Sequence, residues 1–368
     1  MVDGQDPGDR PSFFRKPAPA GSPAPRRPVA PPLPPAVPPP PLPPGPPEHL
    51  SAPPPGVLRR SIFHGTGGTL FGIHVVNTLL ILVTLGVYYF WAKTRLRQYL
   101  FSETEIEGDR FAYHGTGREL LLGTLKAVLV FGVPIVLLKV VRDVLNVPVL
   151  VKFGAELLSA SLVFVLFPVA MVGARRYRLS RTSWRGIRFS FRGRVWELVK
   201  IVLVGSFLTG LTLGLYYPFL LVKRQAFMVS HSYFGSERFD FAGRGRDLFL
   251  FYLQASLLTL PTLGLSWVWY IARKRRYFWD HTSFGAARFS CTVTGRALLG
   301  LWAVNLLLLV GTLGIAWPWV RVRNIHFAFR NLALTGPLDL ARIQQEAQRV
   351  STMGEGLSGF FDSGFDLA

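Results

Sequence analysis

Amide and ammonium side chains within long apolar runs are the residues of this sequence best placed to do chemistry. Asn77 and Asn305 share one position of an internal repeat, and Lys126 and Gln254 share the position before it. Polar groups are costly in hydrocarbon, and in membrane proteins they commonly mark substrate or ion paths. We therefore expect a candidate intramembrane polar site at these four residues. The alternative is that the amides hydrogen-bond neighbouring helices and that Lys126 extends its ammonium group to the membrane surface.

Other reactive residue types do not form a catalytic or metal-binding motif. The sequence contains no H-E-x-x-H, G-x-S-x-G or Walker A string. Glu119, Glu197 and Asp247 occupy one repeat position, where we expect them to pair with arginines or to charge helix N-termini. The single cysteine excludes an intramolecular disulfide, and two histidines in separate units, His64 and His114, are weak support for a metal site. The sequence therefore predicts a protein that is not an enzyme and holds no metal or cofactor.

The composition places the chain in a membrane. Hydrophobic residues make up 49%, charged residues only 17%, and the mean hydropathy is +0.31. A soluble domain of this composition would struggle to cover itself with polar surface. Residues 59–335 carry 34 Lys and Arg against 12 Asp and Glu. Basic residues beside membrane-length apolar runs predict anionic lipids as partners, and they argue against nucleic acid because they form no single soluble face.

Three landmarks recur in one register and define a unit that is repeated five times. Thr-Leu-Gly occurs at 84–86, 212–214, 262–264 and 312–314. A leucine opens each apolar run, at Leu70, Leu120, Leu198, Leu248 and Leu298. The spacing shows that the second unit has a 28-residue insertion, and it lacks Thr-Leu-Gly. The predicted membrane domain, 59–335, therefore consists of units 59–108, 109–186, 187–236, 237–286 and 287–335.

The third landmark is an arginine that precedes a phenylalanine in four of the five units. We expect these arginines to occupy equivalent places at the membrane surface: Arg60, Arg110, Arg188, Arg238 and Arg288. The alternating residues around them, preceded by glycine, predict a short β-hairpin with one aromatic face.

Each apolar run is about 23 residues long, which matches a helix across roughly 30 Å of hydrocarbon. Six straight spans are therefore predicted, at 70–92, 120–141, 155–173, 198–221, 248–271 and 298–320. The predicted fold class is an all-α polytopic membrane protein with about six transmembrane helices and short aromatic β-hairpins in the basic linkers.

A second geometry stays open for the same runs. If Thr-Leu-Gly bends each run into a re-entrant hairpin, every basic linker and aromatic hairpin lies on one side of the membrane. The second unit, which crosses twice, preserves that arrangement. We adopt straight crossings as the prediction, and the sidedness of the termini stays undecided.

Both ends of the chain have the composition of tails. Residues 1–58 hold 22 of the 29 prolines, which predicts an extended, disordered tether with possible docking sites for proline-binding modules. Residues 336–368 are expected to be flexible, and their Ser-Gly-Phe and Phe-Asp phrases could dock a protein partner.

Several strings resemble a known family. The strings are G-x-G-x-x-L at 65–70, T-L-G-V-Y-Y-F-W-A-K-T-R at 84–95 and R-F-x-Y-x-G-x-G-R-E-L at 110–120. They are similar to the YjgN-like family of bacterial inner-membrane proteins, and the likeness covers roughly residues 59–335. The resemblance implies a multi-pass protein of the bacterial inner membrane and implies little chemistry.

Three functions fit these observations. Repeated units with interrupted apolar runs and buried amides favour a transporter or permease. The missing intramembrane carboxylates and the arginine-rich, aromatic interfaces favour a non-catalytic scaffold or lipid-organising protein instead. An enzyme that acts on lipid is the third possibility. We take the transporter as the prediction and the scaffold as its alternative.

Overall fold

The computed structural model describes residues 58–144, 148–337 and 343. The predicted tails, 1–58 and 336–368, lie outside these residues except for Leu58, Gly336, Pro337 and Ile343. The chain divides into two compact parts, residues 1–51 and 52–368, which are not the repeat units. All described residues belong to the part 52–368.

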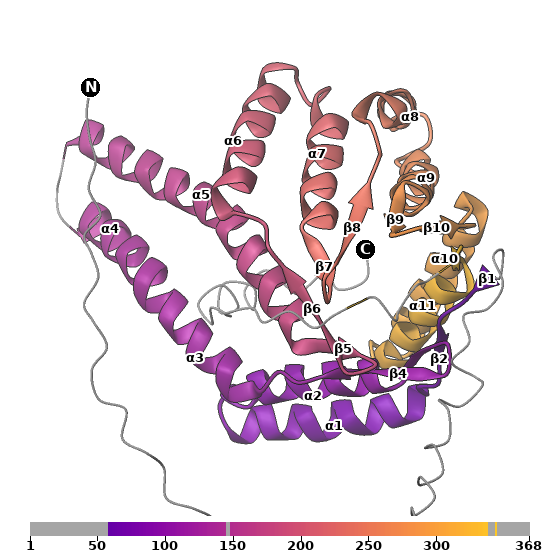
Figure 1. Cartoon of the computed structure of the whole chain (residues 1–368). Helices are drawn as coiled ribbons and strands as arrows, with labels where there is room; N and C mark the ends of the chain where they lie inside the picture. The colour runs from indigo at the N-terminus through magenta and orange to yellow at the C-terminus, as the bar shows by residue number, and fades with distance from the viewer. Residues whose placement is uncertain (1–57, 145–147, 338–342, 344–368) are drawn as a thin grey trace, which may run out of the picture. The chain divides into compact units, whose positions relative to one another are not determined.

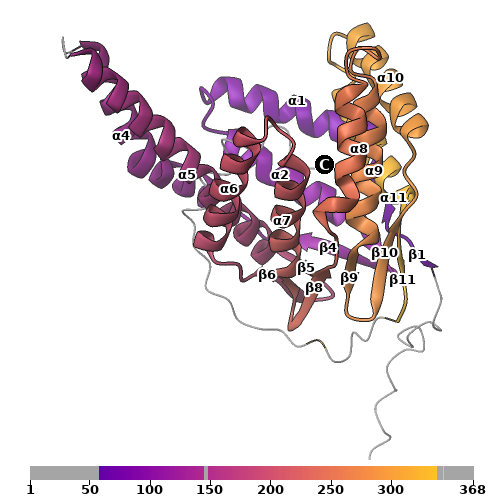
Figure 2. The same ribbon diagram turned by 90° about the horizontal axis from the view of Figure 1, so that it is seen from above.

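Four of the five repeats fold as a pair of helices joined by Thr-Leu-Gly (Figure 1). The pairs are α1 (Gly67–Val83) with α2 (Tyr89–Ser102), α6 (Val195–Leu211) with α7 (Tyr217–Ser230), α8 (Gly245–Leu257) with α9 (Ser266–Asp280), and α10 (Gly295–Gly311) with α11 (Trp317–Arg330). We call these four pairs the short hairpins. Figure 2 shows the turns of α8–α9 and α10–α11 at the opposite end from strands β9, β10 and β11.

The local cause of each turn is the triplet itself. Leu85 and Gly86 both take left-handed backbone conformations, with φ of 50° and 92°, and this reverses the chain. The Thr84 hydroxyl donates to the carbonyl of Leu80 at 2.7 Å and accepts from the amide of Tyr88 at 2.9 Å. One threonine therefore satisfies the end of one helix and the start of the next. The same pair of bonds is made by Thr212, Thr262 and Thr312.

The prediction of an all-α protein with six straight spans is wrong. Within the described residues, only Gly117–Val140 and Val149–Arg181 are long and apolar enough to cross a membrane. Both belong to the second unit, which lacks Thr-Leu-Gly and runs on as α3 (Gly117–Ala127), the π-helical turn η2 (Val128–Gly132), α4 (Val133–Val144) and α5 (Val149–Arg181). The other predicted spans, 70–92, 198–221, 248–271 and 298–320, are all broken at the left-handed pair of residues.

The strands also contradict an all-α fold. They are β1 (Leu58–Arg59), β2 (Ile62–Phe63), β3 (Thr104–Ile106), β4 (Asp109–Tyr113), β5 (Thr182–Trp184), β6 (Ile187–Phe191), β7 (Ser232–Phe234), β8 (Glu237–Phe241), β9 (Thr282–Phe284), β10 (Ala287–Cys291) and β11 (Leu332–Thr335). They form one 11-stranded sheet in the order β1-β11-β10-β9-β8-β7-β6-β5-β4-β3-β2, and the neighbouring pairs are antiparallel. The hairpins expected in the linkers exist, but each also pairs with the next.

The sheet closes on itself because its two edge strands are consecutive in the chain. Only Arg60 and Ser61 separate β1 from β2, while β1 pairs with β11 and β2 pairs with β3. Among the described strands, closure covers the edges that an isolated hairpin would expose.

One face of this ring is aromatic. Cross-strand neighbours Phe189 and Phe234 have ring centroids 4.7 Å apart, and those of Phe239 and Phe284 are 4.6 Å apart. Trp184, Phe234, Phe284, Ala287 and Ile343 are its buried core. Ring pairs at this separation add to the energy of burial, so the aromatic row explains why the hairpins assemble into a single sheet.

Glycines at the helix starts let neighbouring units pack closely. A Cβ on Gly295 would lie 2.5 Å from the ring of Trp269 in the preceding unit, so only glycine fits. The same close contact between a glycine and an aromatic ring occurs for Gly67 with Trp319, Gly117 with Trp91, and Gly245 with Phe219. The junction of the second and third units differs. Val195 replaces the glycine in the third unit, and Val169 replaces the aromatic residue in the second, so both members of the contact change together.

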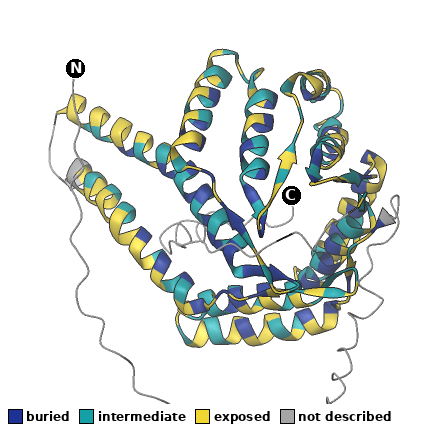
Figure 3. Ribbon diagram, viewed as in Figure 1, coloured by how far each residue is buried: buried dark blue, intermediate teal, exposed yellow. Residues whose placement is uncertain are grey.

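The helices follow one another round the sheet, and α1 packs against α11, so the helical layer closes as the sheet does. Figure 3 shows exposed surface along α4 and the first half of α5, whereas the second half of α5 is buried toward the sheet.

Candidate functional site

The four polar residues that the sequence singled out differ in their exposure. Asn77 and Asn305 are buried, in α1 and α10. Asn305 donates its amide to the side-chain oxygen of Asn324 on α11 at 2.7 Å, within its own hairpin. Lys126 and Gln254 are exposed, on α3 and α8. Asn305 therefore plays the helix-joining part that was the alternative interpretation.

The repeat position of the two asparagines is a site of close helix packing. Ala255 is buried at this position, and a Cβ added to Gly205 there would lie 2.4 Å from Leu220 of the same hairpin. The asparagines are buried because every residue at this position is covered by the partner helix. The Asn77 side-chain oxygen has no hydrogen-bond partner among the described residues.

The predicted interface arginines take equivalent places on the sheet. Arg110, Arg188, Arg238 and Arg288 are all exposed, and each lies opposite the central residue of the preceding strand. The phenylalanine after each one packs on the aromatic face. Arg60 is exposed between β1 and β2. The strands lie at the helix ends farthest from the Thr-Leu-Gly turns. Contact of these arginines with lipid head groups stays a prediction.

Two of the three repeated carboxylates, Glu119 and Asp247, join a first helix to the end of its partner helix. Glu119 accepts hydrogen bonds from the Tyr177 hydroxyl and from Arg181, both at 2.7 Å. Asp247 accepts one from the Tyr277 hydroxyl, also at 2.7 Å. Both carboxylates lie in the first turn of a helix and bind the end of its partner. This is a structural role, and the described residues contain no group of three or more His, Cys, Asp or Glu that could hold a metal ion.

The sequence did not indicate a chamber that lies where the first, second, third and fifth units meet. Its volume is about 520 Å³, and it is lined by α2, α5 and α11 together with residues of β3, β4, β5 and β6. Four arginines line it: Arg97, Arg175, Arg178 and Arg321. No Asp or Glu is among its described lining residues. We call it the arginine chamber.

Hydrogen bonds hold two of these guanidinium groups in place. Arg97 is buried and donates to the Tyr113 hydroxyl at 3.3 Å. Arg175 donates one terminal nitrogen to the Ser232 hydroxyl at 3.2 Å, and its Nε has no partner among the described residues. Fixed cationic donors favour an anion as their ligand.

Positive charge continues on the second helices of the third and fourth units. Burial lowers the pKa of Lys274, and repulsion by Arg224 and Arg275 lowers it further. Burial also lowers the pKa values of Arg224 and Arg275. A group whose charge is disfavoured in this way is stabilised by a nearby anion.

The floor of the arginine chamber is aromatic. The chamber shares Phe111, Phe189, Ile106 and Ser61 with a cavity of about 100 Å³ enclosed by the sheet. A basic wall above an apolar floor fits an anion that carries an apolar group. The described lining contains no paired nucleophile and base, so the arrangement supports binding by charge rather than catalysis.

One sequence signal could have revealed the chamber. Arg97 and Arg175 stand at the same repeat position once the insertion is counted, and α2, α7 and α11 contain no Asp or Glu. Helices that carry arginine and contain no Asp or Glu of their own favour an interior that binds anions. The straight-span prediction hid this signal because it placed these residues in linkers.

Comparisons with known proteins agree with the resemblance stated above. A family model described as "Bacterial protein of unknown function (DUF898)" matches residues 59–265 and 255–360. The inner membrane protein YjgN of Escherichia coli O157:H7 is 38% identical over 130 residues, which are 35% of this chain and 30% of that protein. YjgN of Salmonella typhimurium is 32% identical over 131 residues, 36% of this chain and 31% of that protein. The chain thus spans about 30% of the length of the curated relatives it matches. No solved structure matches.

Proposed function

We propose, starting from the fact that this chain belongs to the family of bacterial proteins of unknown function DUF898, that it organises lipids in one leaflet of the inner membrane without catalysing a reaction. The matched relatives are inner membrane proteins by name, and this chain is a bacterial membrane protein. In the proposal, α3–η2–α4 and α5 cross the bilayer, and the four short hairpins enter one leaflet.

The observation that carries the proposal is the exposure of one leucine at each turn. Leu85, Leu213, Leu263 and Leu313 are 93–97% exposed. Each also takes a left-handed conformation, which is unfavourable for a residue with a branched side chain by about 1 kcal/mol. In water, no favourable interaction would offset either the exposure of the leucine side chain or its left-handed backbone conformation. Transfer of one leucine side chain into hydrocarbon is favourable by about 1.5–3 kcal/mol, which is enough to offset the strain.

Helix lengths support insertion into a single leaflet. The first helix of the first unit, Gly67–Val83, has 17 residues, whereas the matching helix of the second unit continues from Gly117 to Val144. The 11 further positions correspond to about 16 Å along a helix. This is about half of a 30 Å hydrocarbon layer. If the long pair crosses the bilayer, the short hairpins therefore end near its middle.

Depth measurement at the turns tests the proposal. The full chain with Cys291→Ser and Leu263→Cys, labelled with an environment-sensitive fluorophore, is reconstituted in vesicles. We expect quenching by lipids brominated in mid-chain and protection from aqueous iodide. The matched control is Arg238→Cys, which lies on the sheet and should respond to iodide alone. Iodide quenching at the turns of all four hairpins would contradict the proposal.

A second function, passage of a small anion, is favoured by the arginine chamber. Inorganic phosphate should then raise the midpoint of thermal unfolding of the full chain, and Arg175→Gln should remove the effect. Uptake of labelled phosphate into proteoliposomes, lost in the same variant, would support transport. Binding without uptake would leave the lipid-organising function alone.

A further inference from the structure

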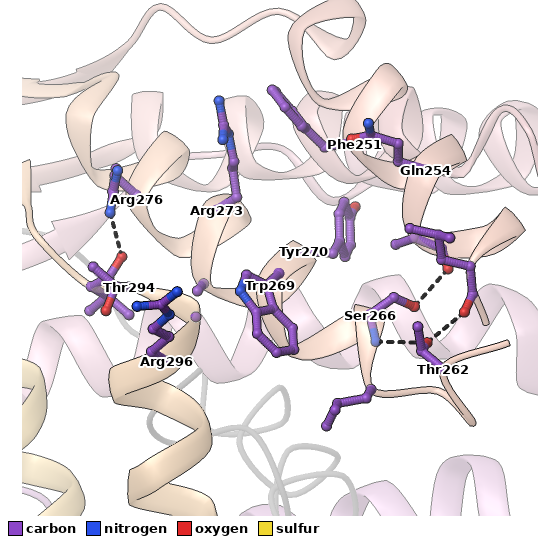
Figure 4. A pocket seen from close by; sticks show the side chains of 16 residues that line it. Phe251, Gln254, Thr262, Ser266, Trp269, Tyr270, Arg273, Arg276, Thr294 and Arg296 are labelled. Carbon is purple, nitrogen blue, oxygen red and sulfur yellow. Dashed lines mark hydrogen bonds between the residues drawn. The ribbon is translucent and has the colours of Figure 1, made fainter.

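An elongated groove of about 620 Å³ lies at the junction of the fourth and fifth units (Figure 4). Its walls are α8, α9 and the start of α10. It is separate from the arginine chamber, with which it shares no lining residue. We call it the lateral groove.

The chemistry of the groove changes along α9. Ser266, Trp269, Tyr270, Arg273 and Arg276 line it at spacings of three or four residues, so they share one face of the helix. From Ser266 to Arg276 the helix rises about 15 Å. The end near the Thr-Leu-Gly turn is completed by Leu258 and Leu265, and the far end is basic. The groove is thus apolar at one end and cationic at the other.

Three guanidinium groups form the basic end. Arg273 stacks on Phe251, with 3.8 Å between the guanidinium carbon and the ring centroid. Arg276 donates to the carbonyl of Val293 at 2.8 Å, which fixes it beside the start of α10. Arg296 lies in the first turn of α10. No carboxylate is among the described residues of the wall, so the charge at this end is uncompensated within the groove.

A buried hydroxyl group between the two ends points independently to a ligand. Tyr270 is 4% exposed, and its hydroxyl has no hydrogen-bond partner among the described residues. Figure 4 shows this hydroxyl on the same side of α9 as Gln254 and Phe251. A buried polar group without a partner costs about 1–3 kcal/mol.

We propose that the lateral groove holds one anionic glycerophospholipid of the leaflet that the short hairpins enter. The phosphate lies among Arg273, Arg276 and Arg296, an ester carbonyl accepts from Tyr270, and an acyl chain follows Leu265 toward the turn. The order of these three groups along α9 is the order in the lipid. This inference rests on the proposed function, because the leaflet fixes the direction of the lipid.

The repeat provides an equivalent place in the chain at which the basic end is weaker. At the junction of the third and fourth units, the positions of Arg273, Arg276 and Arg296 are held by Lys223, Ala226 and Arg246. Two cations remain there, one of them a lysine, which lacks the planar fork that binds phosphate oxygens in pairs. The chain therefore contains its own matched control.

The test measures binding of phosphatidylglycerol and of phosphatidylcholine with the same acyl chains to the full chain in detergent, by native mass spectrometry. Arg273→Gln with Arg296→Gln removes two charges of the site and leaves the Arg276–Val293 bond intact. We expect at least tenfold weaker binding of the first phosphatidylglycerol. The control, Lys223→Gln with Arg246→Gln, should change it less than twofold. Tyr270→Phe, which removes a hydroxyl without a partner, should weaken binding of both lipids about threefold.

Three results would overturn the inference: equal losses in the two double variants, no preference for phosphatidylglycerol in the parent chain, or full competition by millimolar inorganic phosphate. Fluorophore depth at Leu263→Cys is measured in the same variants. A deeply inserted fluorophore without selective lipid binding refutes only the lipid site in the lateral groove. A fluorophore near the membrane surface refutes the proposed function.

Discussion

The second unit and its four relatives start from one plan and end in different structures. Leu120 and Leu248 are both fully buried at the same repeat position, and each opens an apolar helix. In the fourth unit, Thr262-Leu263-Gly264 reverses the chain after one short helix; in the second, no such triplet exists and the helices run on. A short helical hairpin thus goes with the triplet, and a pair of long helices goes with its absence and with the 28-residue insertion.

Converting the second unit into a short hairpin should have the largest effect. Deletion of 134–161, with Leu162-Val163-Phe164 changed to Thr-Leu-Gly, gives this unit the length of the others. The chain then loses both segments able to cross a bilayer. We expect carbonate to extract this variant from membranes while the parent chain is retained. Retention of the variant at the parent level would show that the short hairpins anchor the chain unaided.

A charge at one turn tests the other half of the comparison. Leu263→Asp should oppose insertion of that hairpin by about 3 kcal/mol, because a carboxylate is costly near the bilayer centre. The measurement is protease sensitivity of α8–α9 in vesicles, which should rise. Glu237→Asp on the sheet changes no charge and should leave it unaltered.

Substitution of two glycines in α10 distinguishes the effect of close packing on stability from the effect of backbone entropy. Gly295→Ala places a methyl group 2.5 Å from Trp269 and should destabilise the fold by about 1–3 kcal/mol. Gly300→Ala meets nothing within 4 Å and should stabilise the helix by about 0.5–1 kcal/mol. Thermal unfolding in detergent measures both. Shifts of the same sign in the unfolding midpoints of the two variants would contradict the close contact between Gly295 and Trp269.

Relief of backbone strain at a turn should have opposite effects in two environments. Asparagine tolerates the left-handed region, so Leu313→Asn, at φ 50°, should stabilise the detergent-solubilised fold by about 0.5–1 kcal/mol. In vesicles the same change removes an inserted apolar group and should reduce the depth of the turn. A deeper turn after substitution would show that the leucine is not selected for contact with lipid.

The smallest effect is a dependence on alkaline pH. Burial and the hydrogen bond to Asp247 raise the pKa of Tyr277 to about 12, above its usual value near 10. Below pH 10 the phenol is neutral in both states, and its contribution to stability is fully present. Between pH 10 and 12 the unfolded chain ionises first, so stability falls. Tyr277→Phe should lose this part of the decline, as measured by unfolding midpoints across that range.

The repeat and the linker hairpins could be predicted from the sequence because both depend on neighbouring residues. The bend at Thr-Leu-Gly was one of two geometries that the sequence left open, since a 23-residue apolar run has the same composition whether straight or folded. The difference lies in two left-handed residues and one doubly bonded threonine. The useful signal was a contrast: the unit without the triplet is the one with the insertion.

Sites formed by distant units were harder still. The arginine chamber joins residues from Ser61 to Phe329, and the sequence gives no distance between them. A shared repeat position, as for Asn77 and Asn305, indicates equivalent surroundings and does not by itself indicate proximity. Asn305 instead bonds Asn324, 19 positions away in the same hairpin.

The closure of the sheet has a consequence for how the chain is made. Leu58 in β1 pairs with Thr335 in β11, so the first strand to be synthesised waits for the last. Throughout translation the growing chain therefore carries an open strand edge, and pairing between segments this far apart is slow. A second nascent chain offers the same partner strand sooner if its synthesis is further advanced. Exchange of terminal strands between two such chains would keep every pairing of the monomer and would give a domain-swapped dimer.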